Sequence, residues 1–117
     1  MSAKAFAATI AFASIAFLAA TVSPSLSHAD EQATQLRYQG GRFEPSSVTL
    51  PANTPVKLQV TNASDAAIEF ESFELHRERV VQPGQTITVF IPALAPGSYP
   101  FFNDMNNAEA KGEIVSR

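Results

Sequence analysis

The sequence predicts an all-β protein: a Greek-key β-sandwich of about seven or eight strands, preceded by a cleavable signal peptide. Apolar and polar residues alternate at positions 56–60 and 87–91, which is the period of a half-buried strand. Turn-forming runs such as Gln82-Pro83-Gly84-Gln85 separate the apolar runs at intervals of about 8–12 residues. No long segment after the signal has a helical period. The spacing leaves immunoglobulin-like and other Greek-key sandwiches open.

The N-terminal 29 residues are expected to be an export signal, and residues 30–117 a single domain. Lys4 precedes an apolar run at positions 5–20, and Ser27-His28-Ala29 is a small-x-small cleavage pattern. The apolar run is short for a membrane span, which needs about 20 residues. We therefore expect export and cleavage after Ala29; a retained N-terminal anchor is the alternative.

The predicted elements follow one another closely. A polar leader is expected at residues 30–35, and a first strand with Leu36 and Tyr38 is expected to end in a turn or a bulge at Gly40-Gly41. Pro45 then starts an extended connection. Further strands are expected at positions 47–50, 56–61, 68–71, 73–81, 86–91, 99–102 and 111–115. The last two flank a polar loop at positions 103–110.

Composition excludes several classes of function. The chain of 117 residues has a formal net charge of −3 and no basic run, so nucleic acid is not expected as a partner. It has no cysteine, which excludes disulfides and thiolate metal sites of the blue-copper type. No nucleophile stands at a recognisable spacing from a histidine, so we do not expect an enzyme.

Several short pieces occur in an order and spacing typical of a known family. They include Phe43-Glu44-Pro45 and the segments 48–52, 60–62, 68–72, 81–84, 94–102 and 110–115. Through these pieces, residues 43–115 resemble the cupredoxin-like domain of EfeO-type iron-uptake proteins and their small periplasmic relatives. The resemblance implies a cupredoxin-like sandwich, location in the periplasm and the handling of copper or iron ions.

The resemblance also implies where a metal ion would bind. It makes Glu69 a candidate ligand, with further ligands near position 43 and in the loop at 103–107. Family members often carry Cys or His there, whereas this chain has Phe43, Asn103 and Asn106. The remaining candidate ligands are Glu69, Asp104, Met105 and His76, with Glu71 as a helper.

The residues themselves allow more than one interpretation. Glu69 and Glu71 share a strand face and can clasp a cation, or they can simply face solvent. His76 is expected on one strand face with Glu74 and Glu78, either as a metal site or as a solvated face. Met105 offers a soft sulfur ligand, or it fills the core beneath its loop. Asp104 offers a hard oxygen or caps a turn.

The resulting hypothesis is a protein that binds a transition-metal ion, copper or alternatively iron, weakly or transiently. It would serve as an accessory to metal-ion transport, with an inner-membrane iron permease or another periplasmic metal-uptake protein as its partner. The alternative is a metal-free protein-interaction module of an iron-uptake system. An electron-transfer copper protein is disfavoured because the chain lacks the cysteine ligand.

Overall fold

The computed structural model describes residues 11, 13, 14, 16 and 33–117. The predicted cleavage site after Ala29 and most of the predicted signal lie outside these residues. Within them, no helix is long and apolar enough to cross a membrane.

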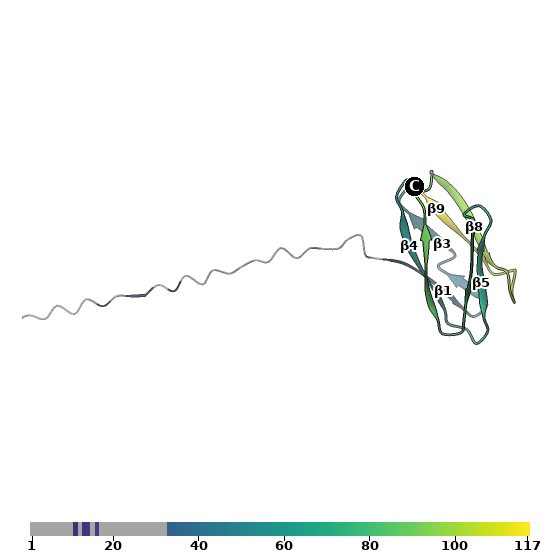
Figure 1. Cartoon of the computed structure of the whole chain (residues 1–117), viewed down its shortest axis with the longest axis horizontal. Helices are drawn as coiled ribbons and strands as arrows, with labels where there is room; N and C mark the ends of the chain where they lie inside the picture. Colours follow the sequence, from purple (N-terminus) through teal and green to yellow (C-terminus); the bar gives the residue numbers. More distant parts are fainter. Residues whose placement is uncertain (1–10, 12, 15, 17–32) are drawn as a thin grey trace, which may run out of the picture.

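In residues 33–117, nine strands form two sheets that lie face to face (Figure 1). One sheet has the order β2-β1-β4-β7 and the other the order β3-β9-β8-β5-β6. The strands are β1 (Thr34–Gln39), β2 (Arg42–Glu44), β3 (Ser47–Leu50), β4 (Val56–Asn62), β5 (Ile68–Ser72), β6 (Arg77–Val81), β7 (Thr86–Ile91), β8 (Gly97–Asn103) and β9 (Lys111–Ser116). The prediction of an all-β sandwich is confirmed.

The strand that the sequence prediction did not include is β2. Gly40 and Gly41 both have positive φ angles, 62° and 75°, and they turn the chain back after β1. Tyr38 then lies opposite Phe43 in an antiparallel pair. Because β2 has only three residues, its alternation is too short to be read from the sequence.

An aromatic cluster fills the core between the sheets. The rings of Phe43 and Phe101 meet edge to face with centroids 5.1 Å apart, and Phe70 lies 5.1 Å from Phe101. Aliphatic side chains of both sheets surround these rings, among them Leu36, Leu58, Val60, Ile68, Val89, Ile91 and Ile114. Burial of these side chains stabilises the sandwich.

Arginine side chains close the edge where β6 meets β7. Arg77 donates from Nε to the carbonyl oxygen of Phe90 at 2.9 Å, and Arg79 donates to that of Thr88 at 3.4 Å. These bonds cap carbonyl groups on an edge strand that, within residues 33–117, has no backbone partner on that side.

Two local predictions are wrong. Residues 73–76 form a turn instead of a strand: the N–H of His76 donates to the carbonyl of Phe73 at 3.2 Å, and His76 has a φ angle of 52°. A left-handed residue breaks strand alternation, so His76 does not share a strand face with Glu78. The prediction that residues 34 and 35 belong to a polar leader is also wrong, because β1 begins at Thr34 and pairs with β4 from that residue.

Candidate metal centre

Strand β5 presents two glutamates on the outward face of its sheet. Ile68, Phe70 and Ser72 point to the interior and are buried, so Glu69 and Glu71 lie on the opposite face. The prediction that the two glutamates share a face is therefore confirmed. The residues beside them on that face are their cross-strand partners on β6 and β8.

Three carboxylates converge at this place. One ligand oxygen from each of Glu69, Glu71 and Asp104 lies within 4.8 Å of the others. Asp104 follows the end of β8, and its backbone N–H donates to the carbonyl of Glu69 at 3.1 Å. A fourth carboxylate is close, because Glu78 on β6 is the register partner of Glu71. We call Glu69, Glu71, Glu78 and Asp104 the acidic cluster.

Glu71 is the unusual member of the acidic cluster. The residue is only 8% exposed, although it stands on the outer face, and its buried Oε2 has no hydrogen-bond partner among the residues that the structure describes. Burial, followed by the charges of Glu78 and Asp104, raises the pKa of Glu71. A buried carboxylate oxygen without a donor is costly, and a bound cation would satisfy it.

The pKa of Glu69 is shifted in the same direction. Its pKa is raised by burial and then by the charges of Glu78, Glu71 and Asp104. Like charges held this close repel one another, and a multivalent cation between them removes that repulsion. The oxygens of the acidic cluster therefore fit a metal ion.

The amides of Asn103 and Asn106 hold the loop against β5. Asn103 is fully buried, and its Oδ1 accepts the N–H of Glu69 at 3.0 Å and that of Met105 at 3.2 Å. Its Nδ2 donates to Asn106 Oδ1 at 3.1 Å. The Asn106 amide in turn donates to the carbonyl of Ala67. Sequence reasoning treated both asparagines only as missing ligands and overlooked this function.

The other positions at which a ligand was predicted are not among the converging carboxylates. Met105 adjoins the acidic cluster in sequence and is 49% exposed, so the interpretation as a core plug is wrong. His76 lies in the turn after β5, and within residues 33–117 no histidine joins the converging carboxylates. Phe43, at a position where the resemblance implied a ligand, is buried in the aromatic core.

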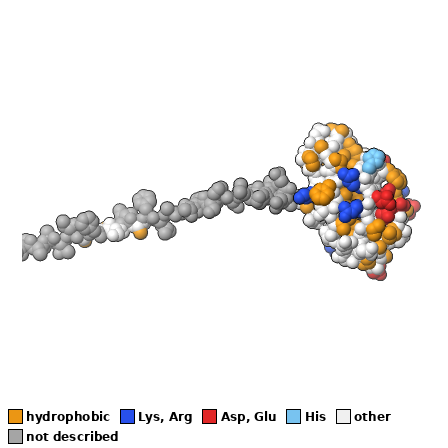
Figure 2. Space-filling model, viewed as in Figure 1, with side chains coloured by type: hydrophobic (Ala, Val, Ile, Leu, Met, Phe, Trp, Pro, Cys, Tyr) orange, Lys and Arg blue, Asp and Glu red, His pale blue; other side chains and the backbone are white. Residues whose placement is uncertain are grey.

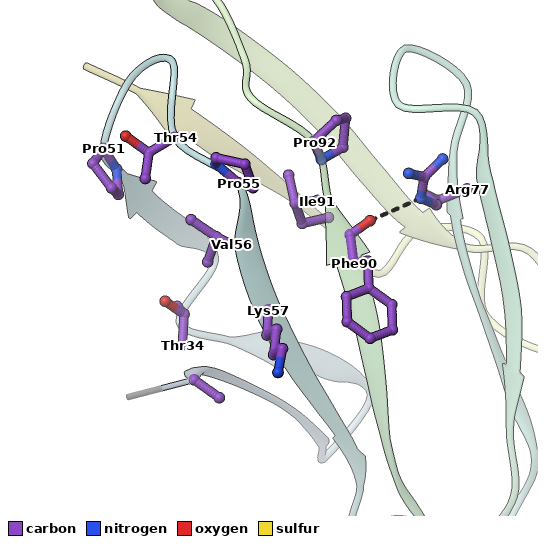
Figure 3. A pocket seen from close by; sticks show the side chains of 11 residues that line it. Thr34, Pro51, Thr54, Pro55, Val56, Lys57, Arg77, Phe90, Ile91 and Pro92 are labelled. Atoms are coloured by element: carbon purple, nitrogen blue, oxygen red, sulfur yellow. Dashed lines mark hydrogen bonds between the residues drawn. The ribbon is translucent and has the colours of Figure 1, made fainter. Parts of the chain in front are cut away.

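A separate surface pocket of about 770 Å³ lies over β4 and β7 (Figure 3). Its walls include Pro51, Pro55, Pro92 and Phe90, and Lys57 places its Nζ 5.9 Å from the centre of the Phe90 ring. Arg77 reaches this region from β6 through its bond to the Phe90 carbonyl. None of the described residues that line this pocket is acidic, so they offer no carboxylate ligand for a cation.

Comparison with known proteins identifies the family. Residues 8–116 match the profile of the cupredoxin-like domain. The chain belongs to the cupredoxin-like domain family. It is also 39% identical over 74 residues to an uncharacterized protein of Rickettsia prowazekii (strain Madrid E). That match covers 63% of this chain and 59% of the relative, so it spans less than two thirds of the relative's length.

Solved structures share the fold of this cupredoxin-like domain. The metal-binding domain of the Cu(I)-exporting P-type ATPase CopA of Streptococcus pneumoniae has a TM-score of 0.66 at 13% identity, covering 73% of this chain and 84% of that one. Reduced auracyanin of Roseiflexus castenholzii has a TM-score of 0.60 at 14% identity, and the match covers 73% of this chain and 96% of that one. The purple cupredoxin of Nitrosopumilus maritimus has a TM-score of 0.56 at 12% identity, and the match covers 72% of this chain and 99% of that one. The cupredoxin-like fold is thereby confirmed.

Proposed function

We propose that this cupredoxin-like protein binds a transition-metal ion, copper or iron, weakly or transiently at the acidic cluster. The observation that carries the proposal is the buried, unpartnered Oε2 of Glu71 beside the carboxylates of Glu69 and Asp104. These side chains would hold the ion, and Met105 would be the soft ligand nearest in sequence. Open coordination positions would be filled by water or by a partner, which suits transient binding.

The choice between copper and iron depends on the donor atoms. Carboxylate oxygens are hard ligands, whereas copper favours nitrogen and sulfur donors. Iron is therefore supported by the three converging carboxylates. Copper is supported by the fold shared with the Cu(I)-carrying metal-binding domain of the CopA ATPase. The ion would be cargo, delivered as an accessory step of metal transport, and the protein itself would not be an enzyme.

The proposed setting is the periplasm. Export rests on the apolar run at positions 5–20 and the cleavage pattern before Asp30. The partner would be an inner-membrane iron permease or another metal-uptake protein that takes up the ion. A domain without cysteine suits this compartment, because it cannot form wrong disulfides there.

The test is a metal titration of the chelator-treated protein with Cu(II), Fe(II), Mn(II) and Zn(II). Glu71→Gln keeps the side-chain shape and removes the charge. The affinity for the bound metal should fall by about tenfold or more, corresponding to at least ~1.4 kcal/mol. Glu69→Gln should act in the same direction. Glu74→Gln is the matched control, because Glu74 is exposed in the turn after β5.

Other outcomes would redirect the assignment. A loss of affinity in His76→Ala but not in Glu71→Gln would place the ion at the turn after β5. If no metal binds, or neither change matters, the alternative of a metal-free interaction module replaces the metal proposal.

A further inference from the structure

Exposed apolar side chains surround the acidic cluster. Phe73 is 66% exposed, Met105 49% and Val80 42%. Met105 directly follows Asp104 in the loop after β8. Four apolar side chains make up what we call the apolar rim: Phe73, Val80, Phe102 and Met105. Isolated exposed hydrophobic residues are ordinary, but a contiguous group around one set of charges marks an interaction surface.

Strand register and ring packing make the apolar rim continuous with the acidic cluster. Val80 is the cross-strand partner of Glu69, and Phe102 is the partner of Glu71 on the other side of β5. Phe73 packs on Phe102 with ring centroids 5.4 Å apart. The rim thus borders the acidic cluster on both neighbouring strands. In the space-filling view acidic side chains gather in one patch with hydrophobic ones beside it (Figure 2).

We infer that the apolar rim and the acidic cluster together dock a protein partner that presents Lys or Arg side chains among apolar residues. Charge complementarity selects this occupant. A second copy that docks through the same face would bring the same carboxylates against Glu69, Glu71 and Glu78 and would be repelled. Nucleic acid and anionic membranes carry the same sign of charge as the cluster.

Docking would exclude water from the rim and leave the carboxylates facing the partner. The Oε2 of Glu71 has no hydrogen-bond partner among the described residues, and a lysine ammonium or an arginine guanidinium of the partner is a donor that this carboxylate can accept from. The apolar rim then packs around that ion pair and excludes water from it, as the residues around a binding hot spot do.

The surface also couples docking to metal loading, and this part rests on the proposed function. A bound metal ion and the partner's cationic side chain compete for the same carboxylates. Metal therefore weakens docking, and by reciprocity the partner weakens metal binding. A partner that docks on this face would discharge the ion as it binds.

The test uses a defined probe, the peptide acetyl-Leu-Lys-Phe-Lys-Leu-amide, titrated into the isotope-labelled protein in the presence of chelator. We expect amide resonances of Phe73, Val80, Phe102 and Met105 to shift. Phe73→Ser should weaken peptide binding by about fivefold or more, because it removes a large exposed contact. Glu71→Gln should also weaken it. The peptide acetyl-Leu-Glu-Phe-Glu-Leu-amide, with the opposite charge, should not bind.

Phe90→Ser provides the matched control. Phe90 is 61% exposed, nearly as much as Phe73, but it lies on β7 in the other sheet. Its loss should leave peptide binding unchanged. Equal binding of both peptides, shifts centred on Phe90, or an unchanged affinity in Phe73→Ser would overturn the inference.

The same titration separates this inference from the proposed function. Peptide binding under chelator does not depend on metal, so it can succeed when metal titration fails. Metal binding with no peptide binding leaves the proposed function intact and removes the docking surface. If both metal and peptide bind, saturating metal should lower the affinity for the peptide by about tenfold. An unchanged affinity would contradict the coupling.

Discussion

The side-chain oxygen of Asn103 accepts the backbone N–H of Glu69 across 3.0 Å, from a position with no solvent exposure. This bond ties the end of β8 to the strand that bears the glutamates. The backbone bond from Asp104 to the Glu69 carbonyl, 3.1 Å long, lies directly beside it. Hydrogen bonds between protein groups therefore hold the loop against β5.

Asn103→Ala should loosen this attachment. The change leaves the N–H groups of Glu69 and Met105 without their acceptor, and unsatisfied buried groups cost about 1–3 kcal/mol. We expect the free energy of unfolding to fall by that amount in urea denaturation, and metal affinity to fall as the carboxylates lose their fixed spacing. Asn107→Ala is the control, since Asn107 bonds to the Gly41 carbonyl outside the cluster. Equal effects of both changes would contradict the positioning function of Asn103.

Acid should stabilise the metal-free protein through Glu69 and Glu71. Both pKa values are raised above the ordinary 4.5, so the folded state binds protons more tightly than the unfolded state. The free energy of unfolding then has a negative slope with pH in the interval from about 4.5 up to the raised pKa values. This contribution is fully present below 4.5 and is lost as pH rises through the folded-state pKa values.

Glu71→Gln isolates this effect. The neutral amide avoids the repulsion from Glu78 and Asp104, and its NH₂ group can donate to those carboxylates. Thermal melts in chelator should show the variant more stable than the wild type at pH 7, with the difference shrinking toward pH 4. A difference that is constant with pH would show that the Glu71 charge is not the cause. Metal affinity of the wild type should rise with pH, because protons compete for the same oxygens.

The alternation of residues along the chain was sufficient to predict most of the fold. Strands β4 and β7 have long runs of period two, and the structure places Leu58 and Val60 in the core as expected. The turn at His76 was missed because the residues on either side continue the alternation. Histidine is one of the residues that adopt a left-handed φ more often than most, but this conformation is uncommon for any non-glycine residue, so the sequence alone did not mark it at His76.

The candidate site was predicted only in part. Glu69 and Glu71 follow from the parity of one strand, and the resemblance pointed to the loop that holds Asp104. The burial of Glu71 could not be predicted, because it depends on which side chains of β6 and β8 lie beside it. That is a matter of register between strands distant in sequence.

Gly112 should not tolerate a side chain. A Cβ at this position would lie 2.6 Å from Cε2 of Phe101 and 2.8 Å from the carbonyl oxygen of Ser46, both closer than real contacts allow. Gly112→Ala should lower the free energy of unfolding by about 1–3 kcal/mol, measured by denaturant titration. Phe101→Leu in the same chain should recover part of the loss, so the double variant should be less destabilised than the sum of the single ones. Strict additivity would show that the Phe101 ring is not the obstacle.

Removal of metal should leave the domain folded. The rings of Phe43, Phe70 and Phe101 and the aliphatic residues around them are buried between the sheets and involve no ligand atom. Chelator-treated protein should therefore keep its β-type circular dichroism and melt cooperatively. Added metal should increase the free energy of unfolding only by the contribution of binding, which is about 2.7 kcal/mol at a metal concentration 100 times Kd. The melting temperature should rise accordingly. A random-coil spectrum under chelator would mean that the ion is part of the fold, and Glu71→Gln would then unfold the protein instead of stabilising it.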